Sequence, residues 1–248
     1  MIEAIVNFFK SLFSGKKTVD KPVVTPVTIA SDKTTVEPVV TPVEPKKDKS
    51  VLDESDFQMA ADILGVEVAV IKAIQKVESS GKAFLAPGKP QILFEGHVFW
   101  SQLKKAGFNP SDIVKKNPEL KTVLYSKWTK EYYKGGIKEY ERLDLAKSID
   151  ISSALASASW GLFQIMGMNY SVCGYDSVEA FVDAMCDSAY KQLEAFCSFC
   201  KGNNLVKYMV NKNWTGFAKK YNGSGYAQNK YDEKLAKAYL KYIDNGQN

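Results

Sequence analysis

The sequence predicts a mainly helical domain with very little sheet over residues 51–248, preceded by a short helix and a linker. Apolar residues recur there at helical spacing, capping residues and glycines lie at the ends of these stretches, and the alternating pattern of strands is sparse. The chain has 248 residues, of which 45% are apolar, 12% aromatic and 25% charged. This composition supplies a buried core, and the length allows one domain of about 100 to 200 residues with an appendage.

We expect residues 1–15 to form an amphipathic helix, because apolar side chains recur there at helical spacing and Lys16 and Lys17 follow. With about 13 residues this helix is too short to span a bilayer, and the stretch lacks the basic start and small-residue cleavage site of a secretion signal. Two interpretations are equally supported. The helix lies flat on a membrane surface, or it docks on the main domain or on a partner.

Residues 16–50 are predicted to be a linker. They contain five of the nine prolines, and residues 14–56 contain no Phe, Tyr or Trp. Such a stretch lacks the bulk for a core and is typical of an extended tether. The sequence Pro-Val-Val-Thr-Pro-Val occurs at residues 22–27 and again at residues 38–43. We favour a solvated, polyproline-like tether over a ligand for a proline-binding domain.

The domain begins with two predicted helices. Ser55 and Gln58 form a capping box that opens the first, and Gly65 ends it. An apolar stripe over residues 70–77 predicts the second, which stops at the Ser-Ser-Gly sequence of residues 79–81.

Further along the chain, residues 91–95 follow Pro90 with a weakly alternating pattern and are expected to be extended. Residues 98–106, closed by Gly107, are expected to be helical. Other helices are predicted over residues 136–149, 177–200, 205–211, 214–221 and 231–243.

Charge and residue counts exclude several function classes. The 33 basic and 28 acidic residues give a net charge of +5, which suits an anionic partner such as cell wall, nucleic acid or an acidic membrane without selecting among them. The single His excludes a zinc motif with two imidazoles. Residues 223–230 lack the spacing of a phosphate-binding loop, so ATP-driven chemistry is not expected. We expect no cofactor and no bound metal.

The four cysteines are too few for a disulfide scaffold. Cys197 and Cys200 have redox or zinc spacing, but only one such close pair exists. Cys186, Cys197 and Cys200 fit one helix as small buried residues, and Cys173 completes the set. We favour free thiols in a protein made in the cytoplasm, with a disulfide open to formation after export.

Glu78 is the most informative carboxylate. It lies four residues after Ile74 and seven after Ile71, on the apolar stripe of its own helix. Burial raises the pKa of a carboxyl group, and an acid that stays protonated near neutral pH can donate a proton to a leaving group. The alternative is a Glu at a helix end that faces solvent or caps a neighbouring helix, and the residue alone does not decide between the two.

Three motifs accompany Glu78 in order along the chain. They are Val-Glu-Ser-Ser-Gly at residues 77–81, Ser-Trp-Gly-Leu-Phe-Gln-Ile-Met-Gly at residues 159–167 and Tyr-Asn-Gly at residues 221–223. Together they resemble the goose-type lysozymes and lytic transglycosylases. The chain more closely resembles the phage-type N-acetylmuramidase (endolysin) family across nearly all of residues 51–239. This resemblance implies a lysozyme-like α+β fold and cleavage of peptidoglycan between N-acetylmuramic acid and N-acetylglucosamine.

The resemblance also assigns catalytic candidates. The family's acid falls on Glu78, its second acidic residue on Glu95, seventeen residues later, and an aromatic residue on Tyr170. Cleavage of a glycosidic bond needs a protonated carboxyl at the bridging oxygen, and either stabilisation of positive charge at the anomeric carbon or activation of water. Glu95 is either that base or a carboxylate that merely holds Glu78 in place. Both interpretations stay open.

Amide and aromatic residues in the same motifs are candidates for substrate binding. Gln164 and Asn169 each offer a donor and an acceptor, and Tyr170 and Tyr221 offer flat faces for sugar rings. Trp160 is expected in the core instead.

Each of two further residues near these motifs has two open roles on the sequence alone. Asn222 is included among the substrate-binding candidates, although a structural role is equally open. His97, which follows Glu95 and Gly96, either orients that carboxylate or is a half-buried structural imidazole, the interpretation that we favour.

The enzyme interpretation is favoured because a wall-binding or virion module that had lost turnover would not need Glu78. A lytic transglycosylase that leaves anhydromuramic ends is the alternative reaction, and a Cys/His peptidase lacks a cysteine in an activating context. We expect a monomer that acts on peptidoglycan glycan strands, with no nucleic-acid partner and with membrane contact through residues 1–15. It is expected to be made in the bacterial host cytoplasm, to act in the periplasm or cell wall, and to need no cofactor.

Overall fold

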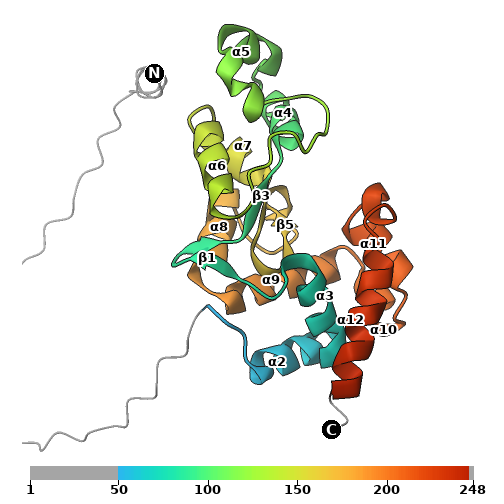
Figure 1. Cartoon of the computed structure of the whole chain (residues 1–248). Helices are drawn as coiled ribbons and strands as arrows, with labels where there is room; N and C mark the ends of the chain where they lie inside the picture. The colour runs from blue at the N-terminus through green and yellow to red at the C-terminus, as the bar shows by residue number, and fades with distance from the viewer. Residues whose placement is uncertain (1–49, 246–248) are drawn as a thin grey trace, which may run out of the picture. The chain divides into compact units, whose positions relative to one another are not determined.

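The computed structural model describes residues 50–245, which are mostly helical with two small sheets, as the sequence predicts (Figure 1). The predicted helix at residues 1–15 and almost all of the predicted linker at residues 16–50 lie outside the described residues. Within the described part of the chain, no helix has the length and apolar character needed to cross a membrane.

The first described helix, α2 (Glu54–Leu64), begins at a different cap from the one predicted. Asp53 is the N-cap, and it exchanges two bonds with Asp56: each carboxylate accepts the other residue's backbone N–H at 3.0 Å. The predicted Ser55–Gln58 box is therefore wrong, because an Asp pair with the same spacing satisfies the free N–H groups two residues earlier. Gly65 ends the helix as predicted, in the left-handed conformation at φ 64°.

Helix α3 (Val68–Ser79) carries the predicted apolar stripe. Ile71 and Ile74 are fully buried, and the helix ends at Ser80, which takes the left-handed conformation at φ 56°. The buried side packs against α2 and against α12 (Tyr231–Asn245), which lies beside α3 in Figure 1. Helix α3 is therefore held between α2, which directly precedes it, and α12, which lies at the other end of the described residues.

A three-stranded antiparallel sheet lies among the helices, in the order β3 (Ile92–Phe94), β4 (Ala158–Trp160) and β5 (Ile165–Met166). β3 confirms the extended segment predicted after Pro90, whereas β4, β5 and the separate hairpin of β1 (Phe84–Ala86) and β2 (Lys89–Pro90) were not predicted. Strands of two or three residues are too short to leave an alternating pattern in the sequence.

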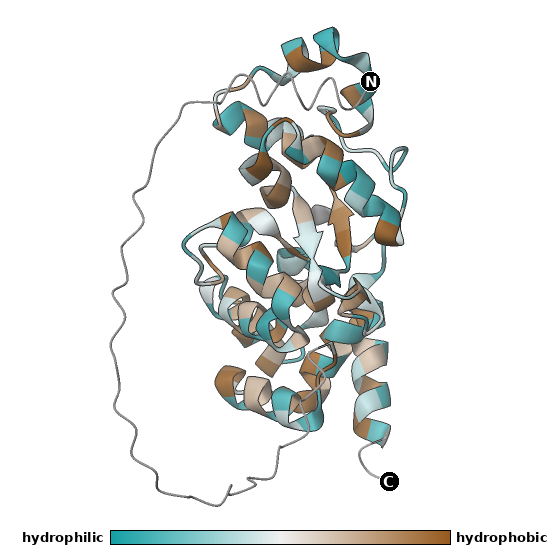
Figure 2. Cartoon of the chain, turned by 90° about the vertical axis from the view of Figure 1, so that its left-hand side faces the viewer, coloured by the Kyte–Doolittle hydropathy of each residue, from teal (hydrophilic) through white to brown (hydrophobic). Residues whose placement is uncertain are grey.

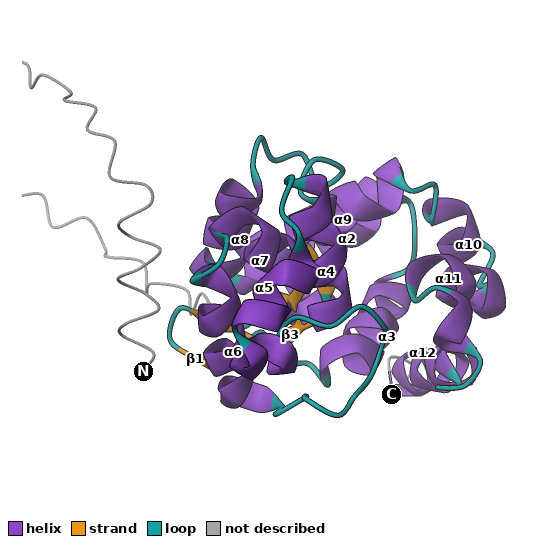
Figure 3. Ribbon diagram, turned by 90° about the horizontal axis from the view of Figure 1, so that it is seen from above, coloured by secondary structure: helices purple, strands orange, loops and turns teal. Residues whose placement is uncertain are grey.

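Helices and short 3-10 turns surround this sheet, and Figure 3 shows β3 among them. They are α4 (Gly96–Lys105), α5 (Pro110–Lys116), η1 (Pro118–Thr122), η2 (Gly136–Lys138), α6 (Glu139–Lys147), α7 (Ile151–Ala156), η3 (Gly161–Phe163), η4 (Gly167–Asn169), α8 (Val178–Asp187), α9 (Ala189–Gly202), α10 (Val206–Val210), α11 (Trp214–Tyr221) and η5 (Ser224–Tyr226). In Figures 1 and 3, α10, α11 and α12 gather on one side and α6 and α8 on the other.

The helices predicted in the second half of the domain are confirmed with one correction. Two helices, α8 and α9, replace the single helix predicted over residues 177–200. Ser188 interrupts it with extended backbone, and its hydroxyl accepts the N–H of Lys191 to start the new helix. Cys186 consequently lies on α8 while Cys197 and Cys200 lie on α9, so the prediction that the three share one helix is wrong.

The four cysteines are free thiols, as predicted. Burial raises the pKa of Cys173 to about 12 and that of Cys197 to about 11, and it raises the pKa of Cys186 and Cys200 as well. Thiols with a raised pKa are poor nucleophiles, which argues against the peptidase alternative.

The core is built on aromatic side chains from segments far apart in the sequence. Phe163 stacks on Phe196 with ring centroids 4.1 Å apart. Trp160 is 2% exposed and donates its indole N–H to the carbonyl of Leu155 at 3.1 Å, which confirms its predicted place in the core. The helices alternate between teal and brown along their length in Figure 2, as expected of amphipathic helices around a shared core.

Candidate active site

Glu78 lies in the last turn of α3 and is partly buried. Burial raises the pKa of its carboxyl group from 4.5 to about 7, while a hydrogen bond from Asn222 and the charge of Lys234 act in the opposite direction. Asn222 donates from Nδ2 to Oε1 of Glu78 at 3.1 Å. The side chain therefore holds a proton near neutral pH and still has groups that stabilise its ionised form.

Tyr221 and Asn222 reach Glu78 from the end of α11. The Tyr221 hydroxyl donates to the carbonyl of Phe163 at 2.5 Å, and its ring stacks on Phe217 with centroids 5.1 Å apart. Burial and the nearby Glu78 charge raise the pKa of Tyr221. One face of this ring is thus covered by Phe217, and its hydroxyl ties α11 to η3.

Asn222 carries a buried acceptor with no partner among the described residues. Its Nδ2 binds Glu78, but its Oδ1 has no hydrogen bond within that part of the chain. A buried carbonyl without a donor is costly unless something else supplies one. At this position the free acceptor lies beside the candidate acid.

Gln164 makes all of its side-chain bonds to the protein. It takes the left-handed conformation at φ 47° directly after η3, and its Oε1 accepts from the hydroxyl of Ser159 at 2.9 Å. Its Nε2 donates to the carbonyls of Gly161 at 2.8 Å and Gln91 at 3.2 Å. These bonds join the residue preceding β3 to β4 and to the turn that leads into β5.

Glu95 lies at the opposite end of β3 from Gln91, as the N-cap residue of α4. Its backbone N–H donates to the carbonyl of Ser157 at 2.9 Å. The Tyr133 hydroxyl donates to its Oε2 at 2.5 Å, and His97 Nδ1 lies 3.4 Å from the same oxygen. The side chain of Glu95 is 16% exposed and that of His97 is 29% exposed. The second carboxylate is therefore held in a setting that is more polar than that of Glu78.

A fully buried ion pair supports the Glu95 side of the site. The Arg142 guanidinium donates to Glu139 Oε2 at 2.7 Å and to the carbonyl of Phe94 at 2.8 Å, and Glu139 also accepts the N–H of Phe94 at 3.2 Å. The second guanidinium nitrogen, Nη2, donates to the Tyr125 hydroxyl at 3.2 Å. Both backbone groups of the residue before Glu95 are thus fixed by this pair.

Asn169 is the last residue of η4, and Tyr170 directly follows it. Within the described residues, neither side chain forms a hydrogen bond with Glu78 or Glu95. Tyr170 lines a pocket of about 370 Å³ between α4, α7 and the start of α8, together with Gln102 and Asp176. Neither Glu78 nor Glu95 lines this pocket. Among the described residues, a hydrogen bond joins Glu78 to Asn222, which directly follows Tyr221, and no hydrogen bond joins Tyr170 to them.

Sequence reasoning missed Tyr133, Arg142 and Glu139. The signal for Tyr133 was present, because residues 125–134 hold four aromatic residues and three lysines. The buried pair left no such signal, since a Glu and an Arg three residues apart on a helix are more often exposed. Within residues 50–245, no group of three or more His, Cys, Asp or Glu side chains is placed to hold a metal ion.

Comparison with known proteins matches this chain to a family. The N-acetylmuramidase family model matches residues 67–243, which include both Glu78 and Glu95. The chain belongs to the N-acetylmuramidase family. A similar solved structure is the crystal structure of a Burkholderia AP3 phage endolysin, with 40% identity, a TM-score of 0.70 and coverage of 80% of this chain and 74% of that chain. The comparison with curated proteins gives no match.

Family membership decides the reaction class. This N-acetylmuramidase is a lysozyme-like glycoside hydrolase, and its substrate is peptidoglycan. The lysozyme-like fold with little sheet, expected from the resemblance, is confirmed. The site of action is the cell wall, in keeping with the similarity to a phage endolysin.

Proposed function

We propose that this N-acetylmuramidase works as an endolysin and cleaves the β-1,4 bond between N-acetylmuramic acid and N-acetylglucosamine with Glu78 as general acid. The observation that carries the proposal is the setting of Glu78, a carboxyl group at a helix end with a pKa raised by burial to about 7. The similarity to the phage endolysin supports the biological role. A group with this pKa is matched to proton transfer near neutral pH.

The contact with Asn222 defines where the acid proton lies. Because Asn222 donates to Oε1 of Glu78, the proton of the neutral acid is held on Oε2. Transfer of this proton to the bridging oxygen lets the leaving sugar depart as an alcohol and leaves positive charge at the anomeric carbon. The Asn222 bond and the Lys234 charge then stabilise the carboxylate that has formed.

For Glu95 we propose the role of base. Tyr133 occupies Oε2, and among the described residues none donates to Oε1. Oε1 takes a proton from the attacking water, whose oxygen bonds to the anomeric carbon. Glu95 then releases this proton to solvent, and Glu78 regains its own proton from solvent. A purely positioning role for Glu95 predicts instead that its removal leaves turnover largely intact.

The remaining candidates are proposed as binding residues. The free Oδ1 of Asn222 is suited to accept the N–H of an acetamido group. Gln164 shapes the groove by fixing the turn after η3, since its own amide is occupied by protein groups. Tyr221 supports Asn222 and η3, and Asn169 and Tyr170 serve a more distant part of the glycan strand.

Mass spectrometry of digested peptidoglycan tests this proposal. We expect reducing N-acetylmuramic ends from the wild type, none from Glu78→Gln, and strongly reduced release from Glu95→Gln. Full release from Glu95→Gln would leave that residue as scaffold, and a majority of anhydromuramic ends would replace hydrolysis with the transglycosylase reaction. Tyr170→Phe distinguishes a catalytic hydroxyl, which the variant lacks, from a ring that only contacts the strand.

Membrane contact through residues 1–15 remains a separate proposal, supported by the apolar face of that stretch and the two lysines that follow it. Flotation with liposomes of anionic lipid compares the full chain with a chain that begins at Lys49. Equal recovery of both in the unbound fraction would overturn it. Light scattering of the full chain tests the expected monomer in the same preparation.

A further inference from the structure

The loop between η1 and η2 carries the most exposed large hydrophobic side chain of the described residues. Trp128 is 59% exposed, and Lys127 and Lys130 on either side of it are also exposed. Lys130 Nζ lies 5.6 Å from the centroid of the Trp128 ring. Within residues 50–245, neither lysine forms an ion pair with an acidic side chain. An exposed indole flanked by unpaired cations calls for a functional explanation.

This loop is anchored at both ends rather than free to move. At its start, the Tyr125 hydroxyl accepts from the N–H of Gly96 at 3.2 Å and from Arg142. At its end, Glu139 accepts the N–H groups of Lys134 at 2.6 Å and Gly135 at 3.0 Å. Trp128 is therefore presented on an ordered backbone, which lowers the entropic cost of binding a ligand there.

The loop that presents the exposed indole also supplies a hydrogen bond to the second carboxylate. Trp128 precedes Tyr133 by five residues in this loop, and it acts on the pKa of Tyr133 in the lowering direction, against the larger raising effects of burial and of Glu95. Tyr133 in turn donates to Glu95 Oε2 at 2.5 Å. One loop thus carries both the exposed indole and the phenol that binds the candidate base, which places Trp128 on the Glu95 side of the site.

The chemistry of this surface matches the substrate. The flat face of the indole suits the apolar face of a sugar ring, and its N–H can bond to a polar group of the sugar. The lysines suit the carboxylates of the peptide stems that N-acetylmuramic acid carries. We propose that Trp128, with Lys127 and Lys130, is a subsite that stacks an N-acetylhexosamine of the glycan strand and pairs with a stem carboxylate. The placement of this subsite next to the scissile bond rests on the proposed role of Glu95.

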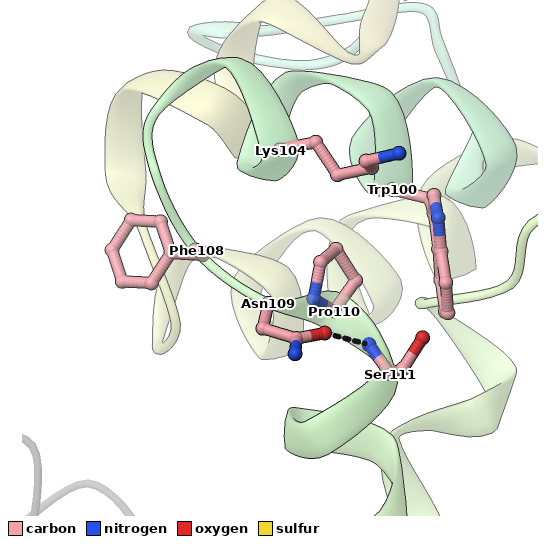
Figure 4. A pocket seen from close by; sticks show the side chains of 6 residues that line it. All are labelled: Trp100, Lys104, Phe108, Asn109, Pro110 and Ser111. Carbon is pink, nitrogen blue, oxygen red and sulfur yellow. Dashed lines mark hydrogen bonds between the residues drawn. The ribbon is translucent and has the colours of Figure 1, made fainter.

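A second Trp and Lys pair provides a matched control. Trp100 and Lys104 of α4 line a separate cavity of about 340 Å³ with Phe108, Asn109, Pro110 and Ser111 (Figure 4). This cavity does not include Glu95 or any residue of the 125–135 loop. Trp100→Phe therefore changes a partly buried indole beside a lysine without changing the proposed subsite.

Binding is measured by isothermal titration calorimetry, which does not depend on an indole reporter, with the tetramer of N-acetylglucosamine in the Glu78→Gln background so that no turnover occurs. We expect a saturable signal, lost or shifted to about fivefold to tenfold weaker affinity in Trp128→Ala, smaller weakening in Trp128→Phe, and parental affinity in Trp100→Phe. Equal affinity in Trp128→Ala and its parent would overturn the inference. Thermal unfolding of each variant checks that the exposed substitution leaves the fold intact.

Kinetics on peptidoglycan separate the parts of the proposal. With Glu78 present, Trp128→Ala should raise KM about fivefold to tenfold and leave kcat within about twofold, and Lys130→Glu should raise KM on peptidoglycan but not weaken binding of the uncharged tetramer. Tyr133→Phe should lower kcat and leave tetramer affinity unchanged. If Glu78→Gln were active, the proposed role of Glu78 as acid would be wrong, but the binding result for Trp128 would still hold. If Trp128→Ala instead lowered kcat and left KM unchanged, the subsite proposal would be wrong, and Trp128 would act by positioning the loop that binds Glu95.

Discussion

The two carboxylate regions of this N-acetylmuramidase differ in how the protein holds them. Glu78 ends a helix packed between α2 and α12, receives one amide hydrogen bond from Asn222, and has its pKa raised by burial. Glu95 begins a helix at the end of a strand, receives a phenol hydrogen bond from Tyr133, and has the imidazole of His97 within 3.4 Å. The comparison teaches that one small fold desolvates one carboxyl group and surrounds the other with polar partners, the two settings that the proposed acid and the proposed base require.

Removal of the Glu78 carboxyl group should have the largest effect. General acid catalysis contributes roughly a hundredfold to ten-thousandfold to such reactions, so Glu78→Gln should lower kcat by about a thousandfold on peptidoglycan. Release of soluble sugars from purified wall measures this loss. Glu119→Gln, a change at an exposed carboxylate on η1, serves as the control and should keep full activity. If Glu78→Gln kept activity within tenfold of the wild type, the assignment of the acid to the Glu78 region would be wrong.

The Glu95 region should depend on its buried ion pair for stability. Arg142 and Glu139 are 2% and 0% exposed, and removal of one partner leaves an uncompensated buried charge. Arg142→Met should lower the free energy of unfolding by about 3 to 5 kcal/mol, measured by urea denaturation.

The double replacement Arg142→Met with Glu139→Gln separates the charge penalty from lost packing. It should recover part of the stability lost in Arg142→Met, because no unpaired charge remains. If Arg142→Met alone were as stable as the wild type, water or another group would have to compensate the charge of Glu139. Exposed Lys134→Ala, which removes only a surface ion pair with Glu141, should change stability by less than about 1 kcal/mol.

Glu78 should in contrast destabilise the fold when it ionises. Its folded pKa of about 7 lies above the ordinary 4.5, so its stabilising contribution is complete below pH 4.5 and is lost as the pH rises through 7. Relative to Glu78→Gln, the wild type should lose about 3 kcal/mol of unfolding free energy between pH 4.5 and pH 8. Urea denaturation of both proteins at the two pH values measures this loss. Groups that titrate alike in both proteins contribute equally and cancel in the comparison. Parallel pH dependence of the two proteins would indicate that Glu78 is not desolvated.

The sequence predicted the Glu78 region much better than the Glu95 region, for a physical reason. The helix around Glu78 is specified by local features, namely the apolar spacing of Ile71 and Ile74 and the residues that stop the helix. Tyr133, which binds Glu95, lies 38 positions away, and Glu139 and Arg142, which bind the backbone of Phe94, lie 45 and 48 positions from that residue. No local pattern specifies these partners. The Ser188 break was missed because a Ser in a helical stretch becomes an N-cap only through backbone geometry that apolar spacing does not encode.

The smallest effect should come from the amide that binds Glu78. Asn222 donates to the ionised and the neutral carboxyl group, but its net effect is to lower the pKa of Glu78. Asn222→Ala should therefore raise that pKa and move the alkaline limb of the kcat profile, expected near pH 7 in the wild type, to higher pH by less than about one unit. The same variant removes the free Oδ1, so KM should rise as well if that atom binds the acetamido group. A pH profile over pH 5 to 9 resolves both effects. An alkaline limb that does not move in Asn222→Ala would show that this hydrogen bond does not set the pKa of Glu78.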